Sequence, residues 1–183
     1  MLTRAEYTSA QSRAVAMIRQ AGIYITDEEA QKVEVADFGL GRLHEEGAQI
    51  LTLVSTDRIA AKHVALFPNQ TLPEHWHPRV GEDPGKEETI RVVSGSARVY
   101  IPGENNMREG FIPAGKESVY TMRHELIFKP GDQMTLEPGT KHWFQAGEQG
   151  AVMYSFSSVA RDVLDGFTDP EIKRVTQIQE SQT

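Results

Sequence analysis

ETIRVVSGSARVYIP, residues 88–102, reads as two short strands that meet at Ser94–Gly95 and end at a proline. β-branched and aromatic residues favour strands, whereas glycine and proline favour turns. Runs of the same kind are QILTLVST (49–56), AKHVALFP (61–68), HELIFKPGD (124–132), MTLEPGTKHWF (134–144) and AVMYSFSS (151–158). Because no helical pattern alternates with them, these strands predict an antiparallel barrel or sandwich and exclude a parallel β–α–β architecture.

The first 35 residues instead predict two helices. Thr3 with Glu6 forms a capping box, in which side chain and backbone satisfy each other's hydrogen bonds. The apolar residues that follow recur at steps of three and four until Gly22, and therefore share one helix face. A second capping box, Thr26 with Glu29, opens a shorter helix that we expect to end near Val33.

We expect one domain over residues 1–183, with the helices in 1–35, the barrel at about 48–160 and a polar tail in 161–183. Residues 103–117 predict a long exposed loop. Within the tail, DPEIKRV (169–175) predicts one short helix.

Composition narrows the possible functions. The net charge is −7 and no run of lysine and arginine stands out, which argues against nucleic acid or an anionic membrane as the partner. The absence of cysteine excludes disulfides and thiolate metal sites. The N-terminal residues lack the apolar run of a signal peptide, and no segment has the length of a bilayer span. A cytoplasmic protein is the expectation.

Histidines give the first indication of a site. His75 and His77 in PEHWHP (73–78) lie two apart, so on a strand both imidazoles face one side while Trp76 faces the other. Alone, this pair is also typical of an ordinary solvated strand. Glu87 or Glu88 adds a carboxylate about eleven residues later, and His142 lies on a strand after a proline–glycine turn. Three imidazoles and one carboxylate suit Mn²⁺, Fe²⁺, Co²⁺, Ni²⁺ or Zn²⁺ and leave positions open for a substrate.

The pattern HWH…E…G (75–95), followed by PGD (130–132) and PGTKH (138–142), resembles the two signature motifs of the cupin superfamily. The resemblance implies a cupin β-barrel whose metal is held by two histidines and a glutamate from the first motif and a histidine from the second. The spacing between His77 and the glutamate is longer than usual in cupins, and PRVGEDPGK (78–86) looks like an inserted loop.

A closer resemblance covers roughly residues 20–175 and is to the bacterial D-lyxose isomerases. It rests on ADFGLG (36–41), STDR (55–58), LFPNQTLPEHWHP (66–78), GKEETIRVVSG (85–95), HELIFKPGDQMTLEPGTKHWFQAGEQGAV (124–152) and FTDPEI (167–172). The resemblance implies a manganese ion on His75, His77, Glu88 and His142, and favours Glu88 over Glu87. It also implies a homodimer and the interconversion of D-lyxose with D-xylulose, with D-mannose and D-fructose as a second pair.

An aldose–ketose isomerase moves a proton between C1 and C2, and negative charge develops on the two sugar oxygens. A divalent metal stabilises that charge, and a positioned base moves the proton. We expect Glu88 to serve as both ligand and base, or a second carboxylate, Glu125 or Asp169, to act as the base. Lys62 is a candidate for stabilising the same charge, because a lysine inside a barrel is costly unless it is paired.

The candidate substrate-binding residues are Lys62, Lys86, Tyr120, Phe144 and Asp169. Several have structural alternatives. Lys62 fits an outward surface position equally well, Lys86 fits a loop, and Tyr120 fits simple packing. Asp169 is also a typical N-cap for a helix that Pro170 begins.

Three other functions remain open at this point. A cupin phosphosugar isomerase needs a basic cluster or a helix N-terminus aimed at phosphate, and the sequence offers scattered arginines instead. An Fe(II) oxygenase uses the same ligand set. A sugar-binding cupin without turnover is disfavoured because all four ligand positions are filled.

Overall fold

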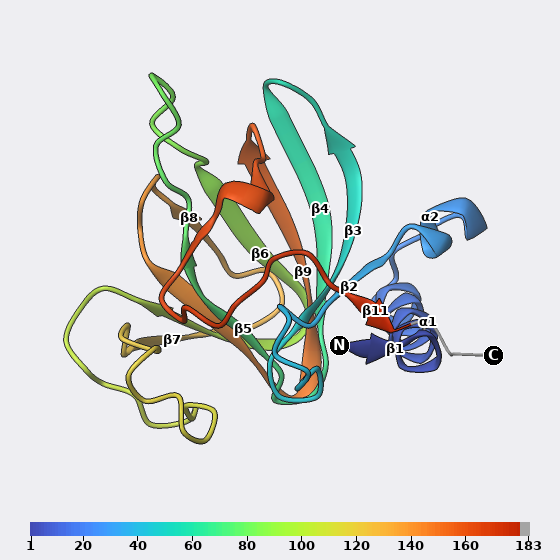
Figure 1. The fold of residues 1–183 in the computed structure, drawn as a ribbon, viewed down its shortest axis with the longest axis horizontal. Coiled ribbons are helices and arrows are strands. Elements are labelled where there is room, and N and C mark those ends of the chain that lie inside the picture. The colour runs from blue at the N-terminus through green and yellow to red at the C-terminus, as the bar shows by residue number, and fades with distance from the viewer. Residues whose placement is uncertain (180–183) are drawn as a thin grey trace.

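A computed structural model of the chain describes residues 1–179, and nine of its strands curl into one antiparallel sheet (Figure 1). The strands of this sheet are β2 (Glu34–Ala36), β3 (Ala48–Ser55), β4 (Ile59–Leu66), β5 (Thr71–Trp76), β6 (Glu88–Ile101), β7 (His124–Phe128), β8 (Gln133–Leu136), β9 (His142–Ser158) and β10 (Gly166–Phe167). Strand order runs β10-β5-β9-β4-β3-β2, and β6 pairs with β7, β8 and β9. Of the antiparallel barrel or sandwich predicted from the short strands, the structure shows the barrel.

Strand β9 organises the barrel because it pairs with β4, β5 and β6 along its 17 residues. The two runs predicted in 88–102 form a single strand, β6, of 14 residues. The pairing of β6 with β9 shifts register on both sides of Gly95, which has a φ of +73°. A Cβ at Gly95 would lie 2.0 Å from the Gly150 carbonyl oxygen, so glycine lets this strand bend where the sequence suggested a break.

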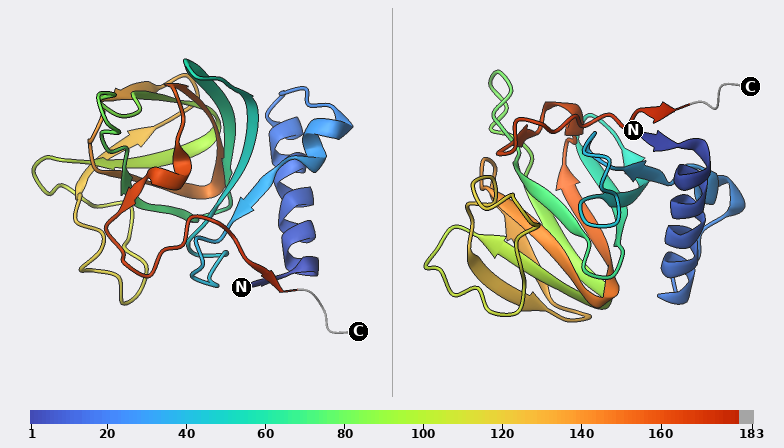
Figure 2. Two further views of the ribbon diagram at one scale, coloured as in Figure 1. Left: turned by 45° about the horizontal axis from the view of Figure 1, so that its top comes forward. Right: turned by 60° about the horizontal axis from the view of Figure 1, so that its bottom comes forward.

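Helices α1 (Arg4–Gln20) and α2 (Asp27–Gln31) lie outside the barrel (Figure 2). Both predicted capping boxes are present, at Thr3 and at Thr26. Helix α2 ends two residues before Val33, because the chain must straighten for β2 to pair with β3. The loop predicted over 103–117 is confirmed, since no helix or strand is assigned there.

Apolar side chains form two main layers. The first fills the barrel interior and includes Leu66, Val92, Phe144 and Met153. The second lies between α1 and the outer face of the sheet and includes Ile18, which is completely buried. Burying one such side chain stabilises the fold by about 1.5–3 kcal/mol, so this layer fixes α1 against β3 and β4.

The segment after β9 crosses the open end of the barrel (Figure 2, left). It contains a 3-10 turn, η1 (Asp162–Leu164), then β10, and finally β11 (Ile178–Gln179), which pairs in parallel with β1 (Leu2–Thr3). The short helix predicted over 169–175 is wrong. Pro170 and Glu171 form a turn, and the backbone N–H of Lys173 donates to the Phe38 carbonyl instead of to a helical partner.

The division into helices, barrel and tail within one domain stays a prediction. Among residues 1–179, no helix is long and apolar enough to cross a bilayer.

Candidate metal centre and its cavity

Four buried side chains converge inside the barrel: His75, His77, Glu88 and His142. One ligand atom from each lies within 4.8 Å of the others. The ring centroids of His75 and His142 are 4.2 Å apart, and His77 lies 5.2 Å from each of them. These are the residues expected as ligands, and the structure brings all four together.

Strand pairing places the histidines. His75 on β5 and His142 on β9 are direct partners in the antiparallel register. This register shifts between Leu72 and His75, where Pro73 lies, and proline cannot donate to a strand ladder. Trp76 is on the opposite side, where Lys141 Nζ lies 4.9 Å from its ring centroid. The alternation expected for His-x-His is therefore present.

The loop between His77 and Glu88 folds back on itself, so the long spacing does not separate the two residues. Val80 and Asp83 form an isolated bridge, and Gly85, at a φ of +109°, packs on the His77 backbone. A Cβ at Gly85 would lie 2.6 Å from the His77 carbonyl oxygen. The loop therefore returns the chain to the cluster with Glu88 buried and Glu87 exposed, in agreement with the choice of Glu88.

The imidazoles present Nε2 to the centre of the cluster. Their Nδ1 atoms bond elsewhere: His75 to the Pro73 carbonyl at 2.8 Å, His142 to the Thr140 carbonyl at 2.8 Å, and His77 to Asp165 at 2.7 Å. Each bond fixes the tautomer in which Nδ1 carries hydrogen and Nε2 offers a lone pair.

His142 Nε2 is buried and has no hydrogen-bond partner among the described residues. Burial lowers the pKa of His142 to about 4, so its lone pair is free at neutral pH. Burial beside two other imidazoles likewise holds the pKa of His75 well below its usual value. An unpaired buried nitrogen costs about 1–3 kcal/mol, and a cation would satisfy it. The cluster therefore fits a divalent metal.

Glu88 supplies the negative ligand. Burial alone would raise its pKa, but Lys86 and His77 outweigh burial and hold the pKa well below the usual range. Glu88 Oε2 lies 3.0 Å from His77 Nε2, and Oε1 accepts hydrogen bonds from Ser155 and Lys86. The carboxylate is thus ionised and oriented before any metal arrives.

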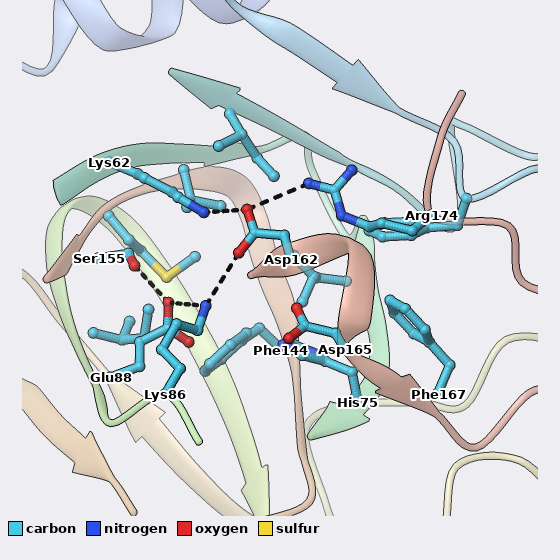
Figure 3. A pocket seen from close by; sticks show the side chains of 16 residues that line it. Lys62, His75, Lys86, Glu88, Phe144, Ser155, Asp162, Asp165, Phe167 and Arg174 are labelled. Carbon is cyan, nitrogen blue, oxygen red and sulfur yellow. Dashed lines mark hydrogen bonds and ion pairs between the residues drawn. The ribbon is translucent and has the colours of Figure 1, made fainter. Parts of the chain in front are cut away.

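A cavity opens beside the cluster (Figure 3). The apolar side chains that line it are Phe38, Ile50, Val64, Leu72, Ile90, Phe144, Met153 and Phe167. Polar and charged side chains lie among them: Lys62, His75, Lys86, Glu88, Ser155, Asp162, Asp165 and Arg174. A small polyol needs this combination, because its hydroxyls require partners while its carbon-bound face packs against apolar groups.

Both candidate lysines point into the cavity. Lys62 is 6% exposed and pairs with Asp162. Lys86 is 7% exposed, and its Nζ lies 3.3 Å from Glu88 Oε1 and 3.5 Å from Asp162 Oδ1. The outward position considered for Lys62 is therefore wrong. Lys86 does lie in the loop before β6, but the loop directs it inward. Phe144 shares the side of His142 and lines the cavity, as alternation predicts.

The sequence reasoning missed the contribution of the tail. Asp162, Asp165 and Arg174 reach the cavity from the segment that crosses the open end of the barrel (Figure 3). Arg174 NH2 lies 3.7 Å from Asp162, and Arg174 also pairs with Glu34 on β2. Asp162 and Asp165, three residues apart, were the available signal, but nothing local shows which face of the barrel the tail covers.

Three predicted site residues lie elsewhere. Glu125 accepts hydrogen bonds from Tyr100 and from the backbone N–H groups of Arg108, Glu109 and Gly110, and thereby ties down the long loop. A base must face the barrel interior, and an inward Glu125 is wrong: Glu125 shares the face of its strand partner Tyr100, whereas Leu126 and Phe128 pack against the barrel core. Glu125 is therefore not among the residues that line the cavity beside the cluster. Its placement argues against a role in catalysis.

Tyr120 and Asp169 are also committed to structural partners. Tyr120 donates to Glu46 at 2.6 Å and packs against Trp143. Asp169 pairs with Lys116 at 2.7 Å and accepts from the Glu171 backbone at 2.9 Å, so it closes a turn and caps no helix. Neither residue is among those that line the cavity, and their placement argues against the predicted contact with substrate.

We expect Glu125→Gln to lower the free energy of unfolding by about 1–3 kcal/mol, because an amide nitrogen cannot accept the bonds that one carboxylate oxygen receives. Turnover should change less than twofold at a temperature where the variant is folded. Urea unfolding and the initial rate measure the two effects. A large loss of kcat with unchanged stability would restore the catalytic role.

The fold and the cluster inside it define a cupin with a candidate divalent-metal site. The particular family follows from the sequence: the chain belongs to the D-lyxose isomerase family, whose model matches residues 25–183. It is 50% identical over 175 residues to the D-lyxose ketol-isomerase of Cohnella laeviribosi, covering 95% of this chain and 96% of that one. It is 46% identical to the D-lyxose/D-mannose isomerase of Thermosediminibacter oceani, covering 98% and 100%.

A solved structure shows the same fold at much lower identity. The L-ribose isomerase of Cellulomonas parahominis superposes with a TM-score of 0.82 at 16% identity, covering 97% of this chain and 98% of that one. The resemblance to D-lyxose isomerases is confirmed, and the chain is a sugar isomerase.

Proposed function

We propose that this isomerase interconverts D-lyxose and D-xylulose, and also D-mannose and D-fructose. The observation that carries the proposal is the buried three-histidine, one-glutamate cluster facing a cavity with two inward lysines. The names of the two relatives support the choice of sugars. D-Mannose has the same configuration as D-lyxose at C2, C3 and C4 and adds one carbon, so a single site can position the reacting end of either sugar.

The metal proposed for the cluster is Mn²⁺, held by His75, His77, Glu88 and His142. When bound, such a cation stabilises the negative charge that develops on the O1 and O2 atoms of the sugar. Affinity alone does not select manganese, because Co²⁺, Ni²⁺, Fe²⁺ and Zn²⁺ accept the same donors.

The lysines would bind and polarise the sugar. Lys62 and Lys86 direct Nζ donors into the cavity, where they can donate to a substrate oxygen as its negative charge grows. Burial alone lowers the pKa of Lys86, but Glu88 and Asp162 outweigh burial and raise it, so this donor stays protonated. The Phe144 ring, which lines the cavity, helps to exclude water from the reacting carbons.

The proton between C1 and C2 requires a base near the cluster. Glu88 remains a candidate, although its Oε1 already accepts from Ser155 and Lys86. Asp162 fills the place expected of a second carboxylate, because its Oδ1 is buried and forms no hydrogen bond among the described residues, with Lys86 Nζ as an ion-pair contact at 3.5 Å. We propose Asp162 as the base, since Oδ1 can take a proton while Oδ2 stays paired with Lys62.

The cavity is poorly suited to a phosphosugar. Its three cations, Lys62, Lys86 and Arg174, already pair with carboxylates. A phosphate dianion would have to displace these partners or leave them unpaired, which is costly in a buried site. A free sugar instead inserts neutral hydroxyls between the existing charges.

The purified protein with Mn²⁺ is expected to convert D-lyxose to D-xylulose, and EDTA treatment should reduce the rate to the background without enzyme. Adding Mn²⁺ back should restore the rate. Ketose formation measured by chromatography gives the rate, and elemental analysis verifies that EDTA removed the metal. Full activity in metal-depleted protein would contradict the proposal. D-Lyxose 5-phosphate tests the phosphosugar alternative and should be a poor substrate.

The homodimer implied by the family resemblance and the cytoplasmic location stay predictions. Light scattering on the purified protein tests the first, since a dimer has twice the mass of the chain.

A further inference from the structure

The three histidines of the cluster are oriented in two different ways. His75 and His142 each bond through Nδ1 to a carbonyl two residues earlier in the chain, at Pro73 and Thr140. Carbonyl groups nearby in the sequence therefore fix the orientation of both rings. His77 differs, because its Nδ1 bonds to Asp165 Oδ1, a side chain 88 residues further along.

Asp165 is held in place by the segment that covers the barrel mouth. It lies between η1 and β10, and β10 pairs with β5 so that Gly166 faces Trp76 and Phe167 faces His75. This pairing leaves the Asp165 side chain 10% exposed, with its oxygen 2.7 Å from His77 Nδ1. A carboxylate so deeply buried on a loop is costly without a charged or strongly donating partner. The contact with His77 supplies one.

We propose that Asp165 is a positioning residue of the metal site and acts through His77. The carboxylate fixes the His77 tautomer and directs Nε2 toward the cluster. It also makes the imidazole a stronger electron-pair donor to a metal. The inference rests on the metal site proposed above, but it assigns the C-terminal segment a part in that site beyond covering it.

Metal binding to the cluster and docking of the segment after β9 onto the barrel should then be coupled. If Asp165 improves metal affinity only when the segment is docked, a bound metal must stabilise docking by the same free energy. The segment would thus report whether the site is loaded, and amide exchange near β10 should slow when metal binds.

Asp165→Ala and Asp165→Asn test the proposal with metal binding as the readout. Mn²⁺ titration followed by electron paramagnetic resonance gives the dissociation constant, and Co²⁺ absorption in the visible range reports the ligand geometry. We expect Asp165→Ala to weaken Mn²⁺ binding by about 10–100-fold and to change the Co²⁺ spectrum. Asp165→Asn should lie between wild type and Asp165→Ala, because the amide oxygen still accepts the bond from Nδ1.

Arg161→Gln is the matched control. Arg161 anchors the same segment through Asp83 at 3.1 Å, and among residues 1–179 it has no hydrogen bond or ion pair with a ligand of the cluster. It should bind Mn²⁺ within about twofold of wild type. Equal losses in Arg161→Gln and Asp165→Ala, or wild-type affinity in Asp165→Ala, would overturn the proposal. If wild type itself binds neither Mn²⁺ nor Co²⁺, the proposed metal site fails first, so the two failures are distinguishable.

Discussion

His142→Ala is expected to abolish isomerisation and Mn²⁺ binding while leaving the metal-free fold nearly as stable as wild type. The loss of affinity should exceed the roughly 10–100-fold that removal of an outer partner of a metal ligand costs, because a ligand itself is lost. The small effect on folding follows from the state of the side chain. His142 Nε2 has no partner among the described residues, so the substitution removes a nitrogen that is costly to bury. The deleted ring leaves a cavity, which offsets that gain.

Thermal unfolding with and without Mn²⁺ separates the two effects. At a metal concentration of 100 times the dissociation constant, a site that binds only the folded state adds about 2.7 kcal/mol to stability. Wild type should gain this increment, whereas His142→Ala should gain none. Control variant His63→Ala removes another buried imidazole, one that contacts Tyr154 and lies outside the cluster. It should retain both the metal increment and turnover. Wild-type kcat in His142→Ala would exclude it as a ligand.

The three histidines of the ligand cluster were predictable because each lies in a recognisable strand pattern. Strand alternation puts His75 and His77 on one side, and the PGTKH motif puts His142 at the start of a strand. Antiparallel pairing then sets His75 opposite His142. The choice between Glu87 and Glu88 needed the family resemblance, because the residues before β6 form an irregular loop in which alternation does not apply.

The side chains that the tail contributes to the cavity could not be predicted, because their positions depend on contacts between distant segments. Asp162, Asp165 and Arg174 belong to a polar segment without a strong periodic pattern, and their partners Lys62, His77 and Glu34 lie 88 to 140 residues away. Glu125 was misplaced for a similar reason. Alternation allows only one of His124 and Glu125 to face the barrel interior and does not say which, and only the path of the long loop shows that backbone N–H groups bond to the Glu125 carboxylate.

Asp162→Leu is expected to lower the free energy of unfolding by about 3–5 kcal/mol, the range for removing one partner of a buried ion pair. Asp162 pairs with Lys62, and its oxygens also lie 3.5 Å from Lys86 and 3.7 Å from Arg174. After the substitution Lys86 keeps Glu88 and Arg174 keeps Glu34, but Lys62 loses the carboxylate with which it pairs. The Lys62 side chain is 7% exposed, so water cannot compensate it well.

Lys62→Met should lower the free energy of unfolding less than Asp162→Leu does, because Asp162 still has Lys86 and Arg174 close by. The double variant Lys62→Met/Asp162→Leu should recover most of the stability lost in Asp162→Leu, since apolar replacement of a buried pair is often neutral or stabilising. Urea unfolding in EDTA measures all three variants without a metal contribution. Glu82→Leu, which breaks the exposed pair with Arg79, should leave stability within error and is the surface control.

The turnover of the double variant tests whether the charges of Lys62 and Asp162 are needed for the reaction. Lys62 and Asp162 are both proposed to act on the sugar, so a folded double variant should have lost turnover while it still binds Mn²⁺. Stability without activity would indicate that these buried charges are retained for their chemistry, because a neutral pair serves the fold as well. If the double variant instead stays as unstable as Asp162→Leu, the ion pair is needed for the packing of the tail over the barrel. A stable double variant that still turns over would contradict the proposed roles of both residues.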